Sequence, residues 1–377
     1  MKVIRRRVYE LRCVLVLGAR PQIIKSAPIV YEASKRSGLM LEIVHTGQHY
    51  DYEMSKVFFD EMSLPEPVAN LGVGSGLHGW QTGKMIMEIE RCLLSLKPDL
   101  VVVPGDTNST IAGALAAAKL HLKVAHVEAG ARSYDMRMPE EVNRRLTDHC
   151  SDILFAVSEN SVSNLQKEGV DKSRIFMSGD TMFDALLQHL PKVQVNPVLE
   201  RFGLEENEYA VLTTHRPENV DSTSNLANIV HAMIELRRLT IVFPVHPRTR
   251  KRLEEAGLMK SLEKAKHILL VSPVGYHEML KLIADARVLF TDSGGMQKEA
   301  FWLRTPCITL RENTEWVETV ELGANILVGA NKELIAKKAE ELLLKENKVN
   351  FGSVPNPYGD GKASSRIVDT LAKIDRL

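Results

Sequence analysis

The chain has 377 residues, a length that corresponds to two domains. Its hydrophobic content of 44% is ordinary for a globular protein and sufficient for sizeable cores. Lysine plus arginine and aspartate plus glutamate both number 48, so the net charge is zero and no overall basic field exists that would attract nucleic acid. An anionic ligand would therefore have to be bound by locally placed cations.

Cysteine usage and the first residues indicate the compartment. The four cysteines are scattered without a CxxC pair, which is typical of a protein from a reducing cytoplasm. Residues 1–7 are basic, as at the start of a signal peptide, but the apolar run at residues 13–17 is too short for a signal peptide or a membrane span. We expect a cytoplasmic protein without a membrane segment, and a short basic extension before the first strand.

Short apolar, β-branched runs alternate with helical patterns along the whole chain. Because these runs are continuously apolar, they are typical of strands buried on both faces of a parallel sheet. The alternation predicts an α/β protein with doubly wound, Rossmann-like sheets and right-handed crossovers. The predicted strands are residues 13–17, 41–45, 100–103, 123–127, 153–157 and 175–177, followed by 210–213, 241–245, 268–271, 288–291, 307–310 and 326–328.

Two proline-containing segments indicate the domain boundaries. Residues 190–197 carry two prolines and little periodicity, and they divide the predicted strands six and six, so we take them as the interdomain linker. Residues 354–361 are rich in proline and glycine and precede a final helix. The expected divisions are residues 1–188, residues 189–358, and a C-terminal helix in residues 359–377 that packs back on the first domain.

Polar residues follow the predicted strands in both halves of the chain. Doubly wound sheets bind ligands beyond the carboxyl ends of their strands, so these loops predict a binding cleft between the two domains. The loops are Gly18-Ala-Arg20-Pro21, Gly47-Gln48-His49, Gly105-Asp106-Thr107, Glu128-Ala-Gly130-Ala-Arg132, His215-Arg216-Pro-Glu218-Asn219, His246-Pro-Arg248 and Asp292-Ser293-Gly294-Gly295.

The segment from Asp292 to Glu299 is the most specific of these signals. Gly294 and Gly295 allow close backbone approach, and the free N–H groups of the following helix together with the Ser293 hydroxyl form an anion site. Glu299, about one turn later, could accept hydrogen bonds from two hydroxyls of a ribose. The simpler interpretation is an ordinary helix cap with flexible glycines. We expect a diphosphate site.

The loop Gly18-Ala-Arg20-Pro21 occupies the corresponding place after the first predicted strand. Gly18 allows the chain to turn, Pro21 suits the first turn of a helix, and Arg20 projects from the loop. Lys25 falls on the same side of that helix as Pro21. We interpret this segment as an anion-binding or catalytic loop; the alternative is a surface arginine.

Asp106 and His215 are further candidates, each with a simpler alternative. Asp106 follows a strand within a glycine-containing turn, where it could be catalytic or could cap the next helix. His215 also follows a strand, and its polar neighbours favour a functional loop over a buried structural histidine. No GxGxxG follows a predicted strand and no HExxH exists, so a zinc site is not expected.

Residues 126–144 combine glutamates and arginines around a turn of small residues. Glu128 follows a predicted strand, where helix capping has little support. Glu140 and Glu141 lie in the first turn of a predicted helix, where the helix dipole favours acidic side chains in any case. This simpler interpretation fits Glu141 best. Arg144 lies one turn further on and faces the same side, where it could orient these acids or contact a phosphate.

These segments, taken together and in order, resemble the motifs of the non-hydrolysing UDP-N-acetylglucosamine 2-epimerases. The resemblance covers the chain after about Leu11. It implies the two-domain GT-B architecture, a homodimer, and reversible conversion of UDP-N-acetylglucosamine to UDP-N-acetylmannosamine without an added cofactor. The matching segments are Gly18-Ala-Arg20-Pro21, Gly105-Asp106-Thr107, His126-Val-Glu128-Ala-Gly130-Ala-Arg132, Pro139-Glu140-Glu141-Val-Asn143-Arg144, His215-Arg216-Pro-Glu218-Asn219, Thr291-Asp292-Ser293-Gly294-Gly295-Met-Gln297 and Asn356-Pro357-Tyr358-Gly359-Asp360-Gly361.

The chemistry implied by the resemblance accounts for the acids. The family eliminates UDP as the C2 proton leaves, and then adds UDP back to the 2-acetamidoglucal with a proton delivered to the opposite face of C2. This route needs carboxylates near both faces of the sugar and cations on the diphosphate. By matched motif, the acid–base carboxylates would be Asp106, Glu128 and Glu140, the residue serving the leaving phosphate His215, the phosphate-binding residues Arg20, Lys25, Arg144, Ser293, Gly294 and Gly295, and the ribose-binding residue Glu299.

Three positions depart from the pattern of many UDP-N-acetylglucosamine enzymes. Gln22 and Lys298 both stand where glutamate is common, and Trp316 stands where arginine is common. These variants resemble the sister enzymes that act on UDP-2,3-diacetamido-2,3-dideoxyglucuronate, because a substrate carboxylate would favour an amide and an added lysine. The body of the chain resembles archaeal UDP-N-acetylglucosamine epimerases, so we prefer that substrate. Gln48-His49-Tyr50 lacks the arginine of bacterial members that a second substrate molecule activates.

A GT-B glycosyltransferase is the main alternative from another class. It would share the fold and the nucleotide site, but it would need an acceptor and would consume the sugar donor. The cluster of acids in the first domain argues against it, since a transferase needs fewer. We therefore expect a UDP-sugar epimerase that supplies a precursor for a surface polysaccharide or glycan.

Overall fold

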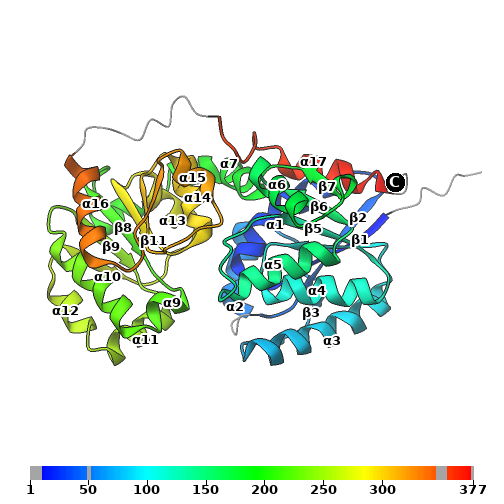
Figure 1. The fold of residues 1–377 in the computed structure, drawn as a ribbon, viewed down its shortest axis with the longest axis horizontal. Coiled ribbons are helices and arrows are strands. Elements are labelled where there is room, and N and C mark those ends of the chain that lie inside the picture. The colour runs from blue at the N-terminus through cyan, green and yellow to red at the C-terminus, as the bar shows by residue number, and fades with distance from the viewer. Residues whose placement is uncertain (1–10, 49–51, 345–354, 375–377) are drawn as a thin grey trace, which may run out of the picture. The chain divides into compact units, whose positions relative to one another are not determined.

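The computed structural model describes residues 11–48, 52–344 and 355–374. Within them the chain divides into two compact units (Figure 1). The first unit extends to Leu187 and resumes at Asn356, and the second covers Gln188–Pro355. The basic extension at residues 1–7 and the predicted positions His49 and Tyr50 lie outside the described residues.

The first unit is built on a seven-stranded sheet in the order β3-β2-β1-β4-β5-β6-β7, with every neighbouring pair parallel. All six strands predicted for this half are present. The additional strand at the edge was missed because it has two residues and no β-branched run. The strands are β1 (Leu11–Leu17), β2 (Leu39–His45), β3 (Ala69–Asn70), β4 (Leu100–Pro104), β5 (Lys123–Ala129), β6 (Ile153–Ala156) and β7 (Ile175–Met177).

Helices pack on this sheet through small and branched apolar side chains. Valines of β1 and β4, such as Val16 and Val103, form one core with Met85 and Ile89 of α3 and with the alanine-rich face of α4. Gly113 of α4 lies so close to Val103 that an added Cβ would be 2.9 Å from its side chain, so the helix can approach the sheet closely. The helices are α1 (Arg20–Ser34), α2 (Tyr52–Glu61), α3 (His78–Leu96), α4 (Asn108–Lys119), α5 (Pro139–Cys150), α6 (Glu159–Lys167), α7 (Thr181–Gln194) and α17 (Ala363–Leu371).

The C-terminal segment belongs to the first unit. Asp184 of α7 accepts hydrogen bonds from the backbone N–H groups of Ala363 and Ser364 at 3.1 and 2.7 Å, and so holds the first turn of α17. The same helix packs against α1. α7 continues through Pro191, so the predicted linker at residues 190–197 is helical over its first part.

The second unit contains a six-stranded parallel sheet in the order β10-β9-β8-β11-β12-β13, and each predicted strand of this half is present. The strands are β8 (Tyr209–Thr213), β9 (Thr240–Pro244), β10 (Ile268–Val271), β11 (Val288–Thr291), β12 (Cys307–Thr309) and β13 (Asn325–Leu327). The helices are α8 (Val198–Phe202), α9 (Pro217–Val220), α10 (Thr223–Glu235), α11 (Pro247–Glu255), α12 (Met259–Lys264), α13 (Tyr276–Ala284), α14 (Gly294–Leu303), α15 (Val317–Glu321) and α16 (Lys332–Leu344).

The prediction of two doubly wound parallel sheets is confirmed. In both sheets the strand order reverses beside the first strand of the unit, β1 or β8, as in Rossmann-like folds. The loops after neighbouring strands therefore meet at one edge of each sheet. No helix in the described parts of the chain is long and apolar enough to cross a membrane.

Candidate active site

Glu128 lies at an irregular point of the central strand β5. The pairing of β5 with β6 shifts register between Val127 and Ala129, and Glu128 has a φ of +76°. A left-handed backbone is costly for a residue with a β-carbon and is found mainly where function or packing requires it. The bulge directs Glu128 to Lys25, whose Nζ lies 2.8 Å from its Oε1. Both side chains are buried.

Asp106 follows β4 in a turn that begins at Gly105. Gly105 has a φ of +71°, which favours glycine, and its N–H donates to the carbonyl of Val127 on β5. The alternative that Asp106 caps the next helix is wrong, because the N-cap of α4 is Thr107, which forms a capping box with Thr110. The Asp106 carboxylate is instead 2.8 Å from Nη1 of Arg144.

Burial favours the protonated form of Asp106. Desolvation is the main cause that raises the pKa of Asp106; the charges of Arg144 and Lys25 oppose it, and the nearby carboxylates of Glu128 and Glu140 add to it. Its side chain is 22% exposed. A partly accessible carboxyl group with a raised pKa is suited to holding and delivering a proton.

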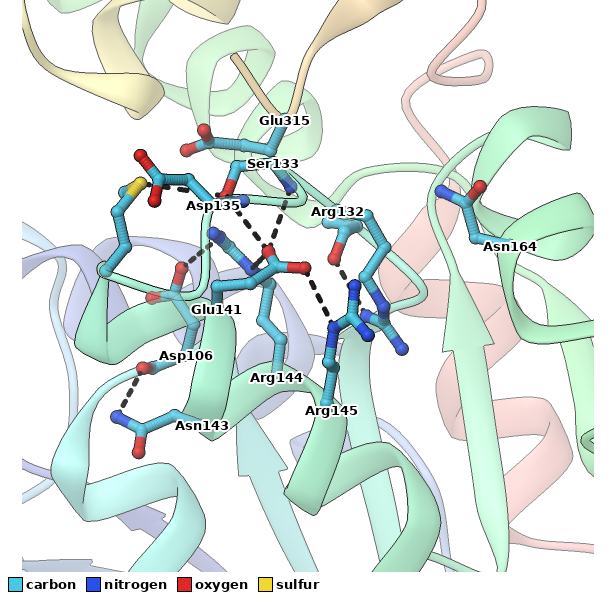
Figure 2. Close-up of polar contacts among 12 residues, drawn as sticks. Asp106, Arg132, Ser133, Asp135, Glu141, Asn143, Arg144, Arg145, Asn164 and Glu315 are labelled. Atoms are coloured by element: carbon cyan, nitrogen blue, oxygen red, sulfur yellow. Dashed lines mark hydrogen bonds and ion pairs between the residues drawn. The ribbon is translucent and has the colours of Figure 1, made fainter. Parts of the chain in front are cut away.

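Glu141 is buried at the start of α5 and binds several donors (Figure 2). One oxygen accepts from the backbone N–H and the hydroxyl of Ser133 at 2.9 and 3.0 Å and faces Nε of Arg144 at 3.3 Å, while the other accepts from Arg145 at 3.1 Å. Burial works to raise the pKa of Glu141, but the hydrogen bond from the Ser133 backbone and the charge of Arg144 outweigh it and hold the pKa below its usual range. Glu141 lies in the first turn of α5 as predicted, and these contacts add to the favourable effect of the helix dipole.

Arg144 joins two of the acids. Its Nη1 binds Asp106 and its Nε binds Glu141, so one guanidinium spans the β4–α4 turn and the first turn of α5 (Figure 2). The neighbouring Asn143 donates to the carbonyl of Asp106 at 3.0 Å. Glu140 is partly exposed beside them and acts on the charge of Asp106. Of the two roles considered for Arg144, orienting the acids is the one that the contacts support.

The α1 candidates separate into an exposed and a buried cation. Arg20 is exposed at the first residue of α1, with its guanidinium 5.4 Å from the ring centroid of Phe58. Lys25 is buried and paired with Glu128. Gln22 lies between them in sequence and is 0% exposed: its oxygen accepts from the N–H groups of the loop, and its amide donates to the carbonyl of Pro104 at 2.9 Å.

His215 follows β8 in the second unit, and its side chain is 38% exposed. The alternative of a buried structural histidine is therefore wrong. Nδ1 of His215 lies 3.3 Å from Oδ1 of Asp292, and the ring centroid is 6.2 Å from that of His246. The Nδ1 edge of the imidazole is thus held by a carboxylate, and the side chain remains partly exposed.

Asp292 holds the loop that carries His215, a role that was not predicted. Its buried carboxylate accepts from the hydroxyl of Thr214 at 2.7 Å, from the N–H groups of His215 and Arg216 at 3.1 and 3.0 Å, and from the amide of Asn219 at 3.1 Å. This set of four donors around one residue could not be inferred from its position after a strand. Asp292 does not cap α14, because the N-cap is Ser293.

The start of α14 has the features predicted for an anion site. Ser293 is the N-cap, but its hydroxyl makes no capping hydrogen bond. A Cβ on Gly294 would lie 2.4 Å from Oε1 of Glu315, so any larger residue here would require the Glu315 side chain to shift. Gly294 and Gly295 form the first turn, whose N–H groups are directed out of the helix start. Glu299 is buried on the same helix.

Lys298 is buried against an aromatic side chain. It is 0% exposed, and its Nζ lies 3.6 Å from the ring centroid of Trp316, which is also buried. Two of the three departures from the family pattern thus lie against each other inside the second unit, and the third, Gln22, is an internal hydrogen-bonding residue of the first unit. In the described residues no group of three or more histidine, cysteine or acidic side chains could hold a metal ion.

Comparison with known proteins identifies the family. The family model described as UDP-N-acetylglucosamine 2-epimerase matches residues 31–372. The chain is 49% identical to a UDP-N-acetylglucosamine 2-epimerase of Methanocaldococcus jannaschii, over 95% of this chain and 98% of the relative. It is 44% identical to a UDP-2,3-diacetamido-2,3-dideoxy-D-glucuronate 2-epimerase of Pseudomonas aeruginosa, over 97% and 100%.

Solved structures agree with this family. The crystal structure of Methanocaldococcus jannaschii UDP-GlcNAc 2-epimerase in complex with UDP-GlcNAc and UDP has a TM-score of 0.89 and 50% identity, and covers 96% of this chain and 99% of that chain. A glycosyltransferase of Rickettsia africae has a TM-score of 0.58 at 14% identity over 98% of this chain and 100% of that chain, which shows a shared fold alone. The predicted GT-B type of architecture is confirmed.

Proposed function

This chain belongs to the UDP-N-acetylglucosamine 2-epimerase family, and we propose that it interconverts UDP-N-acetylglucosamine and UDP-N-acetylmannosamine. One observation carries the proposal: Asp106, Glu128 and Glu140 gather at the carboxyl edge of one sheet, where Arg144 binds Asp106 and Lys25 binds Glu128. The relative from Methanocaldococcus jannaschii that is named for this activity is 49% identical over 95% of the chain.

We infer that the reaction proceeds by elimination and re-addition. The proton on C2 of an N-acetylhexosamine is not adjacent to a carbonyl, so a carboxylate cannot simply remove it. If the C1–O bond breaks with its electron pair going to the UDP phosphate, the electrons of the C2–H bond form the C1–C2 double bond of 2-acetamidoglucal, and a base takes the proton. Re-addition of UDP to C1, with a proton delivered to the opposite face of C2, completes the inversion.

The environments of the acids support separate roles in this sequence. Glu128 is paired with the Lys25 ammonium, which favours its ionised form, so it suits the role of a base. Asp106 has a raised pKa and suits the delivery of a proton. Glu140 is the third carboxyl group of the set. Lys25 and Arg144 bind carboxylates directly, so we propose that their main role is to orient the acids. Any effect of these two cations on the phosphate would act through those acids.

The second unit supplies groups for the UDP. The N-cap Ser293 with Gly294 and Gly295 would bind the diphosphate through the helix start, and Glu299 would bind the ribose. His215, held by Asp292, would donate a hydrogen bond to the departing phosphate. Arg20, exposed at the start of α1, is a further cation for the diphosphate. We propose no metal or organic cofactor, so activity should survive treatment with EDTA.

The diacetamidoglucuronate epimerase is the second candidate function, favoured by the 44% identical relative from Pseudomonas aeruginosa. The structure weakens the residue argument for it. Gln22 is an internal hydrogen-bond bridge, and Lys298 lies under Trp316, so neither is placed to recognise a substrate carboxylate. A glycosyltransferase remains the alternative from another class, and it differs in requiring an acceptor.

One experiment tests the proposal. The purified protein is incubated in D2O with UDP-N-acetylglucosamine, and C2 is followed by proton NMR without any acceptor. We expect deuterium at C2 together with the manno epimer. Exchange with the diacetamidoglucuronate alone would transfer the proposal to the sister reaction, and no exchange with either sugar would refute both.

Three broader assignments belong to the same proposal. We propose a homodimer that acts in the cytoplasm and supplies a precursor for surface polysaccharide or glycan synthesis. The free state of all four cysteines is compatible with a reducing compartment. Light scattering after size-exclusion chromatography should give a mass near twice 42.2 kDa, and a monomeric mass would contradict the dimer.

A further inference from the structure

His126 is buried at 0% exposure on β5, between two oxygens. Its Nε2 lies 2.7 Å from the carbonyl oxygen of Gly105, and its Nδ1 lies 2.6 Å from Oδ1 of Asp148, which is also 0% exposed on α5. Neither contact involves a group to which the proposed reaction assigns a role. The histidine belongs to the matched motifs, but nothing in the proposed reaction uses it.

The partners of His126 define its protonation. A carbonyl only accepts, so Nε2 must carry a hydrogen that is donated to Gly105. Burial raises the pKa of Asp148, but the charges of His126 and Arg132 outweigh it and keep the pKa below its ordinary value, so Asp148 is a carboxylate. Its other oxygen binds Arg132 at 2.7 Å and accepts from Gly130 N–H at 3.2 Å. The contact at Nδ1 therefore joins the ring to the same carboxylate that Arg132 and Gly130 bind.

Arg132 is paired within the same network. It forms a double hydrogen bond with Glu168, with distances of 2.9 and 2.7 Å. The buried guanidinium is thus bound by two carboxylates, those of Asp148 and Glu168. This pairing is needed because an unpaired charge in the interior would destabilise the fold by several kcal/mol, on the order of the penalty for a buried ion.

The network contacts the backbone segments that carry the proposed acids. Gly105, whose carbonyl accepts from His126, immediately precedes Asp106 at the point where the chain leaves the sheet. His126 itself is two residues before the bulged Glu128, and Asp148 holds Gly130, two residues after it. Asp148 also lies on α5, the helix that carries Glu140. The contact between His126 and Asp148 therefore ties together three segments whose relative placement defines the acid cluster.

We propose that His126 is a positioning residue, whose hydrogen bond to the Gly105 carbonyl fixes Asp106 relative to Glu128. The inference rests on the proposed function and deepens it. The two hydrogen bonds have separate effects: the bond to Gly105 positions the acid, and the bond to Asp148 fixes the imidazole ring in place. Both contacts are short, at 2.7 and 2.6 Å, and both are buried, which suits a positioning role.

A matched pair of variants separates the two bonds. In His126→Gln the amide nitrogen takes the place of Nε2 and keeps the bond to Gly105, and in His126→Asn it takes the place of Nδ1 and keeps the bond to Asp148. We expect His126→Asn to lose about 30-fold in kcat, in the range seen for a misplaced catalytic group, with KM changed less than about twofold. His126→Gln should lose less than about fivefold in kcat.

Stability should follow the opposite order. His126→Gln leaves Oδ1 of Asp148 without the contact from the imidazole and should have the lower Tm. His126→Asn keeps this contact and should be the more stable of the two. A merely structural histidine predicts that activity and Tm fall together, in the same order for both variants. That result, or a kcat for His126→Asn close to that of the wild type, would overturn the proposal.

Hydrogen exchange makes the test independent of the substrate. Peptides that cover residues 100–110 are followed by mass spectrometry in the wild type and both variants. Faster exchange is expected there in His126→Asn and not in His126→Gln, and equal exchange in the two variants would overturn the positioning role. An inactive wild type would refute the proposed reaction while leaving this exchange result to decide whether His126 holds the Asp106 turn. Asp148→Asn retains the Gly105 bond and should behave as His126→Gln does if either histidine variant does not fold.

Discussion

The carboxyl edges of the two sheets are built differently. In the first unit, Asp106, Glu128 and Glu141 each bind a buried lysine or arginine, so the edge is a set of ion pairs. In the second unit one carboxylate, Asp292, is held mainly by backbone N–H groups, a hydroxyl and an amide, with Nδ1 of His215 further away at 3.3 Å. Ion pairs allow the charge on an acid to change as a proton moves, whereas a ring of neutral donors holds one charge in place. The contrast indicates proton transfer in the first unit and binding of a constant anion in the second.

The largest effect should come from the first unit. Glu128→Gln removes the proposed base but keeps the shape of the side chain, so turnover should fall by about 1,000-fold, within the range for loss of general base catalysis. The Kd for UDP, measured by calorimetry, should change less than about twofold, because Glu128 belongs to the proton-transferring acids of the first unit and not to the proposed UDP site. Glu90→Gln on the exposed face of α3 is the matched control. A turnover near that of the wild type would remove Glu128 from the catalytic set.

The corresponding change in the second unit should affect binding more than turnover. Asp292→Asn places an amide where four donors converge, so the Thr214–Asn219 loop loses its anchor and is destabilised by about 1–3 kcal/mol. We expect the Kd for UDP to rise about tenfold, with a smaller loss in kcat. Asp221→Asn, which changes an exposed carboxylate at the end of the same loop, is the control. A large loss of kcat with unchanged UDP affinity would contradict the assignment of this edge to the anion.

Two acids bound to the same arginine should respond to pH in opposite directions. The pKa of Glu141 is below its ordinary 4.5, so Glu141 stabilises the fold above about pH 4.5 and this contribution is lost as the pH falls through the folded pKa. The pKa of Asp106 is above its ordinary 3.8, so its contribution is fully present below about pH 3.8 and is lost as the pH rises through the folded pKa.

Thermal unfolding of Glu141→Gln and Asp106→Asn between pH 4 and 8, a window chosen around both shifts, checks these signs. At neutral pH Glu141→Gln should unfold at a lower temperature than the wild type, since buried donors worth about 1–3 kcal/mol lose their acceptor, and the deficit should shrink on acidification. Asp106→Asn should match or exceed the wild type at neutral pH while losing activity. A change of unfolding temperature with the same sign in both variants would contradict the distinction between an acid that anchors its neighbours and an acid that transfers a proton.

The smallest effect is expected inside the second unit. Trp316→Arg places a guanidinium beside the buried Lys298 and should lower Tm, whereas the double variant with Lys298→Glu restores an ion pair, with a coupling on the order of 1 kcal/mol. Because neither side chain is placed to contact a ligand, the preference between the two UDP-sugars should change less than about threefold in kcat/KM. A reversal of preference would show that this pair determines the substrate.

The sequence predicted the architecture well because the signals are local and repeated. Twelve apolar runs matched the twelve longer strands, since strands buried on both faces need uninterrupted branched side chains. The two-residue edge strand β3 carries no such signal, and it forms only because β2 offers it an edge.

The candidate site was predicted as a list of residues, but not as a set of contacts. Loops after strands are recognisable in the sequence, so Asp106, Glu128 and His215 could be singled out. Whether an acid transfers a proton or only anchors neighbouring groups depends on partners far apart in the chain. Lys25 is 103 residues from Glu128, and Asp292 is 77 residues from His215. For the same reason the contacts of Glu141 with Ser133 were not predicted. Gln22 was connected to the substrate, although its side chain accepts hydrogen bonds from its own loop.

Cleavage of the C1–O bond is the step on which the whole account depends, and positional isotope exchange tests it directly. UDP-N-acetylglucosamine labelled with ¹⁸O in the bridge between C1 and the β-phosphorus is incubated with the enzyme, and the label is located by ³¹P NMR. Elimination predicts that the bridging label moves to non-bridging positions of the β-phosphate as the epimer forms, and that Glu128→Gln suppresses both. Formation of the epimer with the label retained wholly in the bridge would contradict the mechanism.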